Sequence, residues 1–138
     1  MAKILLVDDD EGLRKGLRLT LTRHGHEVVE VANGAKAWVT FQARPADLVI
    51  MDLIMPEKEG LETIREFRRN GAKTKILAIS GGGRVDARNL LAIAEQMGAD
   101  KALAKPFTYE ELDAVLKILL PGNTQVPGSR PATEIPKK

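Results

Sequence analysis

Carboxylate, hydroxyl and amine side chains, which are common in catalytic and metal sites, stand at the ends of short apolar runs in this 138-residue sequence. Asp8 and Asp9 follow "ILLV", Asp52 follows "LVIM", Ser80 closes "ILAIS", and Lys105 comes directly after "KALA". A carboxylate at the end of an apolar run is costly to bury unless it is paired or binds a cation. The sequence therefore predicts a function for these residues if the fold brings them together.

The apolar runs alternate with segments of helical periodicity, in which Leu13, Leu17 and Leu21 are typical in their spacing of four residues. Gly25 stands where a helix commonly ends, and Asn33 where one commonly begins. The predicted strands are 3–8, 26–31, 47–52, 74–80 and 101–104. The predicted helices are 11–25, 33–43, 60–71, 86–98 and 108–120, the last opening with the capping box of Thr108 and Glu111.

Strands that are apolar on both faces and alternate with amphipathic helices indicate a parallel sheet covered on both sides. Five such units predict an α/β, doubly wound (βα)5 fold with the flavodoxin-like strand order 2-1-3-4-5. The carboxyl ends of parallel strands share one edge of the sheet, where such folds bind ligands. The polar residues that follow these strands are therefore expected to lie close together.

The expected cluster combines three carboxylates, a hydroxyl and an ammonium group. The carboxylates of Asp8, Asp9 and Asp52 repel one another, and a hard divalent cation such as Mg²⁺ would relieve that repulsion. Mg²⁺ prefers oxygen ligands and is commonly held by one or two carboxylates together with phosphate. With Lys105 nearby, a phosphoryl group arriving at Asp52 would meet two sources of positive charge. A carboxylate can itself be the nucleophile in such a transfer.

Composition limits the other classes of function. With 43% apolar and 29% charged residues, residues 1–120 are expected to form one globular domain. The chain has no cysteine, no apolar run near the roughly 20 residues of a membrane span, and no secretory signal pattern, so a cytoplasmic location is expected. Residues 1–120 carry 18 basic and 18 acidic side chains, which argues against direct nucleic-acid binding.

Residues 121–138 differ in character from the preceding chain. They contain four prolines and two glycines, and their apolar residues have no period. Such a composition predicts a disordered tail or linker stub.

Four motifs in order along the chain resemble the receiver domain of response regulators in two-component signalling, over residues 3–120. Within that family, the chain is similar to the stand-alone chemotaxis regulators. The motifs are "LLVDDD" (5–10), "VIMDLIMPEKEG" (49–60), "ILAISG" (76–81) and "ALAKPF" (102–107).

The resemblance implies a metal site and a phosphorylation site. It implies that Asp52 accepts the phosphoryl group, that Asp9 binds Mg²⁺ directly, and that Asp8 orients the metal and its water. Asp52 and the backbone carbonyl of Ile54 would complete the protein ligands of Mg²⁺.

The resemblance also assigns roles to the last two strand ends. Ser80 would bond a phosphoryl oxygen, and Lys105 would pair with the phosphoryl group. The Lys105–Pro106 peptide bond is expected to be cis, which is common only before proline.

The sequence departs from the family pattern at positions that carry and time the signal. Family members commonly have an aromatic residue three positions before the lysine, and Ala102 stands there. The usual aromatic switch is therefore absent or replaced. Ile54 and Gly82 occupy positions that commonly tune the lifetime of the phosphoryl group, and neither side chain can position an attacking water. We therefore expect dephosphorylation without help from them.

By resemblance, the chain is expected to be a stand-alone receiver that accepts a phosphoryl group from a sensor histidine kinase or a phosphotransfer protein. It would signal to an unknown downstream protein by direct contact, as a monomer or weak dimer, without binding a membrane. It is not expected to be an enzyme beyond its own phosphorylation and dephosphorylation.

Other functions on the same fold remain as alternatives. A Mg²⁺-dependent phosphohydrolase would need a second acid two residues after Asp52, where Ile54 stands. A flavin or nucleotide carrier would need a phosphate-binding first loop, but that loop reads "DDDEG". A degenerate receiver that binds partners without phosphorylation is the third. His24 and His26 flank a turn expected on the far edge of the sheet, so a metal pair or phosphorelay histidine is disfavoured there.

Overall fold

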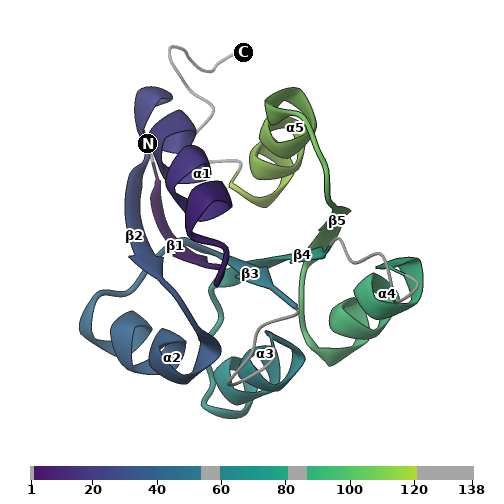
Figure 1. The fold of residues 1–138 in the computed structure, drawn as a ribbon. Helices are drawn as coiled ribbons and strands as arrows, with labels where there is room; N and C mark the ends of the chain where they lie inside the picture. The colour runs from purple at the N-terminus through teal and green to yellow at the C-terminus, as the bar shows by residue number, and fades with distance from the viewer. Residues whose placement is uncertain (1, 54–59, 81–86, 121–138) are drawn as a thin grey trace, which may run out of the picture.

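The computed structural model describes residues 2–53, 60–80 and 87–120 of the chain, with backbone alone for 87–91. Five strands and five helices alternate along this part of the chain, as predicted (Figure 1). The strands are β1 (Lys3–Val7), β2 (Glu27–Val31), β3 (Leu48–Asp52), β4 (Lys75–Ser80) and β5 (Lys101–Ala104). The helices are α1 (Glu11–Arg23), α2 (Gly34–Ala43), α3 (Gly60–Arg69), α4 (Ala87–Met97) and α5 (Tyr109–Leu119). The predicted bounds agree with these to within two residues at each end.

The strands form one parallel sheet in the order β2-β1-β3-β4-β5, which confirms the predicted fold. At the carboxyl edge, Val7 of β1 pairs with both Val31 of β2 and Met51 of β3. Ser80 of β4 pairs with Ala104 of β5. The register therefore places Asp8, which follows β1, level with Asp52, which ends β3, and it places Lys105 just beyond Ser80 at the same edge.

Two apolar layers lie on opposite faces of the sheet. Helices α2, α3 and α4 cover one face, and α1 and α5 cover the other (Figure 1). On the first face, Trp38 and Phe41 of α2 are half-buried, and both rings lie against the buried ring of Phe67 of α3. Successive residues of β1 and β3 point alternately into the two layers, which explains why these strands are apolar throughout.

Local side-chain contacts define the helix ends. Asp10 caps α1 by accepting a hydrogen bond from the Leu13 amide, and Asn33 caps α2 in the same way. The predicted capping box of Thr108 and Glu111 is present at α5. After α1, Gly25 has a φ of +94°, a conformation that a side chain would strain.

Within the described residues, no helix has the length and apolar character needed to cross a membrane. Three predictions lie outside the described residues: the carbonyl ligand of Ile54, the role of Gly82, and the disorder of residues 121–138.

Candidate functional site

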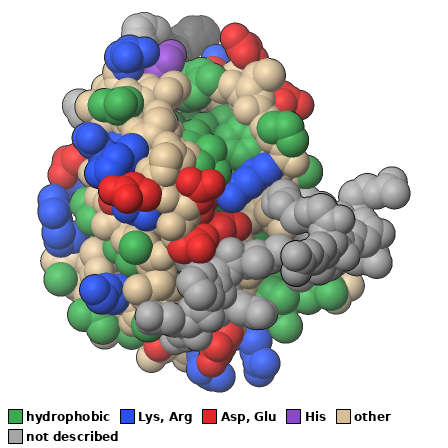
Figure 2. All heavy atoms as spheres, in the orientation of Figure 1, with side chains coloured by type: hydrophobic (Ala, Val, Ile, Leu, Met, Phe, Trp, Pro, Cys, Tyr) green, Lys and Arg blue, Asp and Glu red, His purple; other side chains and the backbone are tan. Residues whose placement is uncertain are grey.

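Three carboxylates meet at the carboxyl edge of the sheet. Ligand oxygens from Asp8, Asp9 and Asp52 all lie within 4.8 Å of one another. Asp52 ends β3, and the Asp8–Asp9 pair follows the last residue of β1, so the pairing of these two strands sets the separation of the carboxylates. Figure 2 shows acidic side chains gathered at the centre of this face of the molecule.

Asp8 is fully buried, and both its carboxylate and its backbone amide form hydrogen bonds. Its Oδ1 accepts a hydrogen bond from the Asp10 amide at 2.9 Å, and its Oδ2 accepts one from Lys105 Nζ at 3.2 Å. Its own amide donates to the Val31 carbonyl at 3.1 Å. Asp9 differs, because its side chain is exposed to solvent. The pair therefore consists of one fixed, buried carboxylate and one that is open to solvent.

Lys105 joins the acids across the sheet. Its Nζ lies 3.2 Å from Asp8 Oδ2 and 3.6 Å from Asp52 Oδ1. Its backbone amide donates to the Ser80 carbonyl at 2.9 Å, and the Lys105–Pro106 peptide bond is cis, as expected. The ammonium group thus offsets part of the carboxylate charge in this structure.

Ser80 is buried at the end of β4, and its hydroxyl has no hydrogen-bond partner among the described residues. A buried hydroxyl without a partner costs stability, and such groups in native proteins are explained by strain, by a bound water or ion, or by a catalytic role. The hydroxyl is therefore available to an incoming group at the carboxyl edge.

The first turn of α3 packs directly against the end of β3. The Gly60 amide donates to the Leu53 carbonyl at 3.1 Å. A Cβ atom at Gly60 would overlap the Asp52 carbonyl oxygen and lie 2.7 Å from the Leu53 Cα. The absence of a side chain at Gly60 is what lets α3 approach the backbone of Asp52 so closely.

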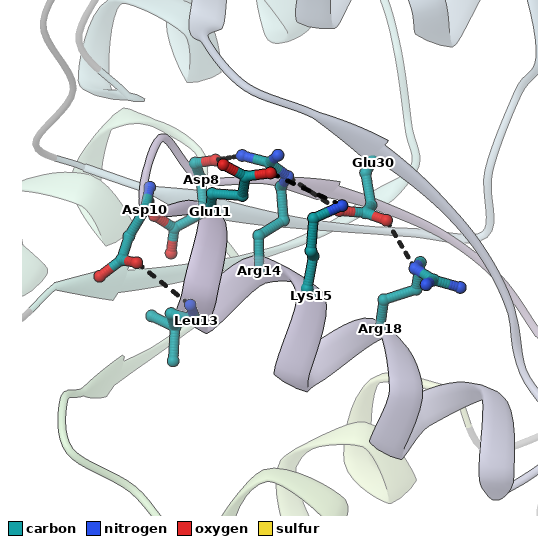
Figure 3. A network of polar contacts seen from close by, with 8 residues as sticks. All are labelled: Asp8, Asp10, Glu11, Leu13, Arg14, Lys15, Arg18 and Glu30. Atoms are coloured by element: carbon teal, nitrogen blue, oxygen red, sulfur yellow. Dashed lines mark hydrogen bonds and ion pairs between the residues drawn. The ribbon is translucent and has the colours of Figure 1, made fainter.

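An ion-pair network that the sequence did not predict joins α1 to β2 (Figure 3). Arg14 Nη1 donates to the backbone carbonyl of Asp8 at 2.8 Å, and Arg14 Nε donates to Glu30 at 2.9 Å. Arg18 Nε forms a second ion pair with Glu30 at 2.6 Å. Helical periodicity places Arg14 away from the apolar stripe of α1 but gives no sign that it reaches back to Asp8.

The donor set fits a hard divalent cation. Each of the three clustered residues offers carboxylate oxygen, the ligand type that Mg²⁺ prefers, and the exposed Asp9 leaves space for the waters that Mg²⁺ retains. Asp52, with only 4% of its surface exposed, belongs to this cluster and also lies beside Lys105. The arrangement can hold a cation and an anionic group side by side.

Ala102 on β5 is half-buried and packs against the layer that contains α2, α3 and α4. Its strand partner on β4 is Ala78. Both residues of this strand pair are therefore alanine, and position 102 lacks the aromatic side chain expected from the family resemblance.

The family model described as "response regulator receiver domain" matches residues 4–117. Among curated relatives, response regulator MprA of Mycolicibacterium vanbaalenii is 35% identical over 127 residues. That match covers 92% of this chain and 54% of MprA, so the chain spans about half the length of this relative.

Solved structures of related proteins are also similar to this chain in fold. Chemotaxis protein CheY4 of Vibrio cholerae has a TM-score of 0.77 at 31% identity, over 87% of this chain and 99% of that one. Response regulator TrrA of Thermotoga maritima, in complex with Mg²⁺ and BeF, has a TM-score of 0.76 at 32% identity, over 87% of this chain and all of that one. With its sheet order and its acidic edge, the chain belongs to the response regulator receiver domains of two-component signalling.

Proposed function

We propose that this receiver domain accepts a phosphoryl group on Asp52 from a phosphohistidine, in a reaction that requires Mg²⁺. The observation that carries the proposal is the convergence of Asp8, Asp9 and Asp52 within 4.8 Å of one another, with Lys105 Nζ beside both buried acids. This is the donor set that phosphoryl transfer to a carboxylate requires. The related protein TrrA, which holds Mg²⁺ and BeF, supports the same assignment.

Asp52 would attack the phosphorus of the donor with a carboxylate oxygen. A P–O bond forms, the P–N bond breaks, and its electron pair returns to the imidazole of the donor. Bound Mg²⁺ would supply positive charge to the phosphoryl oxygens during this transfer. Lys105 would supply a second positive charge by leaving its contact with Asp52 for a phosphoryl oxygen.

Ser80 would donate its unpartnered hydroxyl to another oxygen of the phosphoryl group. This contact exists only when the phosphoryl group is present, so it favours one conformation of the β4 end over the other. The changed surface would then be recognised by a partner protein. We propose a sensor histidine kinase or a phosphotransfer protein as the donor, and a cytoplasmic protein as the recipient of the signal.

Whether the receiver acts by itself is a separate proposal. CheY4 is matched over nearly its full length, whereas MprA is matched over about half. We propose stand-alone action through protein contact. An antibody against this domain would test it by the size of the protein detected in the native cells: a band near 15.1 kDa supports stand-alone action, and a band about twice as large contradicts it.

The chemical proposal is tested with phosphoramidate, a small donor that carries the P–N bond of phosphohistidine. Wild-type protein would be incubated with phosphoramidate and either Mg²⁺ or a chelator, and intact mass would be followed over time. We expect the addition of one phosphoryl group with Mg²⁺ and none with the chelator. Equal addition in both samples would remove the metal from the mechanism, and no addition in either would leave a receiver that acts without phosphorylation.

A further inference from the structure

The Asp8–Asp9 peptide group lies just beyond the paired part of β1. The register of β1 with its two neighbours ends at Val7, and the last recorded bond to the sheet is the one from the Asp8 amide to the Val31 carbonyl at 3.1 Å. Among the described residues, the recorded sheet hydrogen bonds therefore do not reach the Asp8 carbonyl or Asp9. Asp9 is exposed, and its carboxylate makes no hydrogen bond that the structure records among the described residues. The direction of the Asp9 side chain therefore depends on how its own backbone is held.

Arg14 holds that backbone. Its Nη1 donates to the Asp8 carbonyl oxygen at 2.8 Å, and the carbonyl shares a rigid plane with the amide nitrogen and Cα of Asp9. Fixing the direction of the carbonyl therefore fixes the plane from which the Asp9 side chain projects. The Arg14 side chain is only 12% exposed, and Glu30 of β2 holds its Nε at 2.9 Å, so the guanidinium is itself fixed (Figure 3).

We propose that Arg14 is a positioning residue for the metal site, which sets the direction of Asp9 through the Asp8 carbonyl. The inference rests on the proposed Mg²⁺-dependent function and extends it to a residue of α1. Removing a group that orients a metal ligand without itself binding the metal typically lowers metal affinity by about 10–100-fold.

Arg18 supplies a matched control. It lies one turn further along the same helix and contacts the same Glu30, at 2.6 Å, but has no recorded contact with Asp8. Arg14→Met and Arg18→Met each remove one positive charge, keep an unbranched side chain, and leave Glu30 with one guanidinium. Only Arg14→Met removes the donor to the Asp8 carbonyl.

Two possible roles of Arg14, through its charge or through its hydrogen bond, predict opposite changes in Mg²⁺ affinity when Arg14 is replaced. If Arg14 acted only by its charge, its loss would strengthen Mg²⁺ binding, because a nearby cation repels the metal. If it positions Asp9, its loss weakens Mg²⁺ binding by about tenfold or more, while Arg18→Met leaves the affinity unchanged or slightly stronger.

The test is calorimetric titration of Mg²⁺ into wild type and both variants, with chemical denaturation in chelator to show that each is folded. A dissociation constant raised about tenfold or more in Arg14→Met alone supports the inference. Equal constants in the two variants, or tighter binding in Arg14→Met, overturn it. Arg14→Lys, which keeps the charge and one donor group, serves if Arg14→Met does not fold, and it must still bind Mg²⁺ more weakly than Arg18→Met. Failure of the wild type itself to bind Mg²⁺ would instead overturn the proposed function.

Discussion

Lys105 connects the two buried acids of the site. Its Nζ lies 0.4 Å closer to Asp8 than to Asp52, at 3.2 and 3.6 Å. A phosphoryl group on Asp52 would offer the ammonium additional anionic oxygens close to the longer of these two contacts. Lys105 can therefore follow the charge from the resting site to the phosphorylated site with a small movement of its end.

Ser80 is expected to affect the phosphorylated state more than the resting state. Its buried hydroxyl has no recorded partner among the described residues, so Ser80→Ala should leave the free energy of unfolding of the resting protein unchanged or raised by up to about 1 kcal/mol. The gain in stability on phosphorylation should be smaller in the variant. Urea denaturation of both proteins, with and without a phosphodonor, measures both effects.

Thr74 provides the comparison for that experiment. Its hydroxyl donates to the Ala46 carbonyl at 2.9 Å, so Thr74→Val should lower the free energy of unfolding by about 1 kcal/mol. A loss of stability in Ser80→Ala as large as that in Thr74→Val would mean that the Ser80 hydroxyl is already bonded in the resting state.

At the scale of helices and strands, the approach of α3 to β3 is a close steric fit. Gly60→Ala would place a Cβ atom on the Asp52 carbonyl oxygen, so either the helix or the strand end must move. We expect a loss of about 1–3 kcal/mol in the free energy of unfolding and slower phosphorylation of Asp52. Denaturation and the rate of intact-mass change with phosphoramidate would record both.

Gly16→Ala is the control for this substitution. Gly16 is exposed within α1, and a Cβ atom there meets nothing within 4 Å. Alanine is the better helix former, so this variant should be more stable by up to about 1 kcal/mol. If both variants gained stability, the contact of α3 with the Asp52 backbone would not be tight.

The turn between α1 and β2 should make stability depend on pH. Burial lowers the pKa of the His26 imidazole below its ordinary value of 6.5, and nearby positive charge, including that of His24, lowers it further against the opposing effect of Asp113. The unfolded chain therefore binds the proton more readily than the folded one. The contribution of His26 to stability is present above pH 6.5 and is lost as pH falls through its folded pKa.

His26→Asn tests this sign. The asparagine can still accept the hydrogen bond that His26 Nδ1 accepts from the Ala2 amide at 3.3 Å, but it does not titrate. Melting temperatures should fall less between pH 7 and 5 in this variant than in the wild type. His24→Asn removes only one of the lesser causes of the lowered His26 pKa, so it should reduce the fall less than His26→Asn does. An undiminished fall in His26→Asn would exclude His26 as the cause.

Much of the arrangement of elements could be predicted because it depends on local patterns. The capping box of Thr108 and Glu111, the cap at Asn33 and the period of the apolar residues each mark an element within a few residues of chain. The alternation of the elements then dictates a parallel sheet. Its carboxyl edge gathers the predicted site residues that the structure describes.

The contacts that are specific to this chain could not be predicted in the same way. Arg14 of α1 donates a hydrogen bond to the carbonyl of Asp8, six residues earlier and outside the helix. The helical and strand periods predict contacts only within one element, so they do not predict this one. The overlap at Gly60 depends on how closely α3 packs, which follows from the three-dimensional fit of the layers. Both contacts act on the backbone of the carboxylate residues that the sequence motifs identify.

At the scale of the whole molecule, Mg²⁺ should stabilise the fold, because the metal site joins β1 to β3. A ligand that binds only the folded state adds about 2.7 kcal/mol at one hundred times its dissociation constant. We expect the wild-type melting temperature to rise with Mg²⁺ and to return on chelation. Asp9→Asn should abolish most of this rise, since Asp9 is the exposed member of the carboxylate cluster.

The same variant should not harm the metal-free protein. Asp9 makes no recorded hydrogen bond within the described residues, and losing its charge relieves repulsion from Asp8 and Asp52. Glu95→Gln, an exposed acid near the end of α4, should keep the full response to Mg²⁺. An equal response in Asp9→Asn and Glu95→Gln would place the metal elsewhere.

Phosphorylation of Asp52 is tested most directly by locating the phosphoryl group on the chain. Protein treated with acetyl phosphate and Mg²⁺ would be reduced with borohydride, which converts an aspartyl phosphate to homoserine, and then analysed by peptide mass. We expect homoserine at position 52 and at neither Asp8 nor Asp9. Homoserine at another position, or at none in folded protein that binds Mg²⁺, would contradict this expectation.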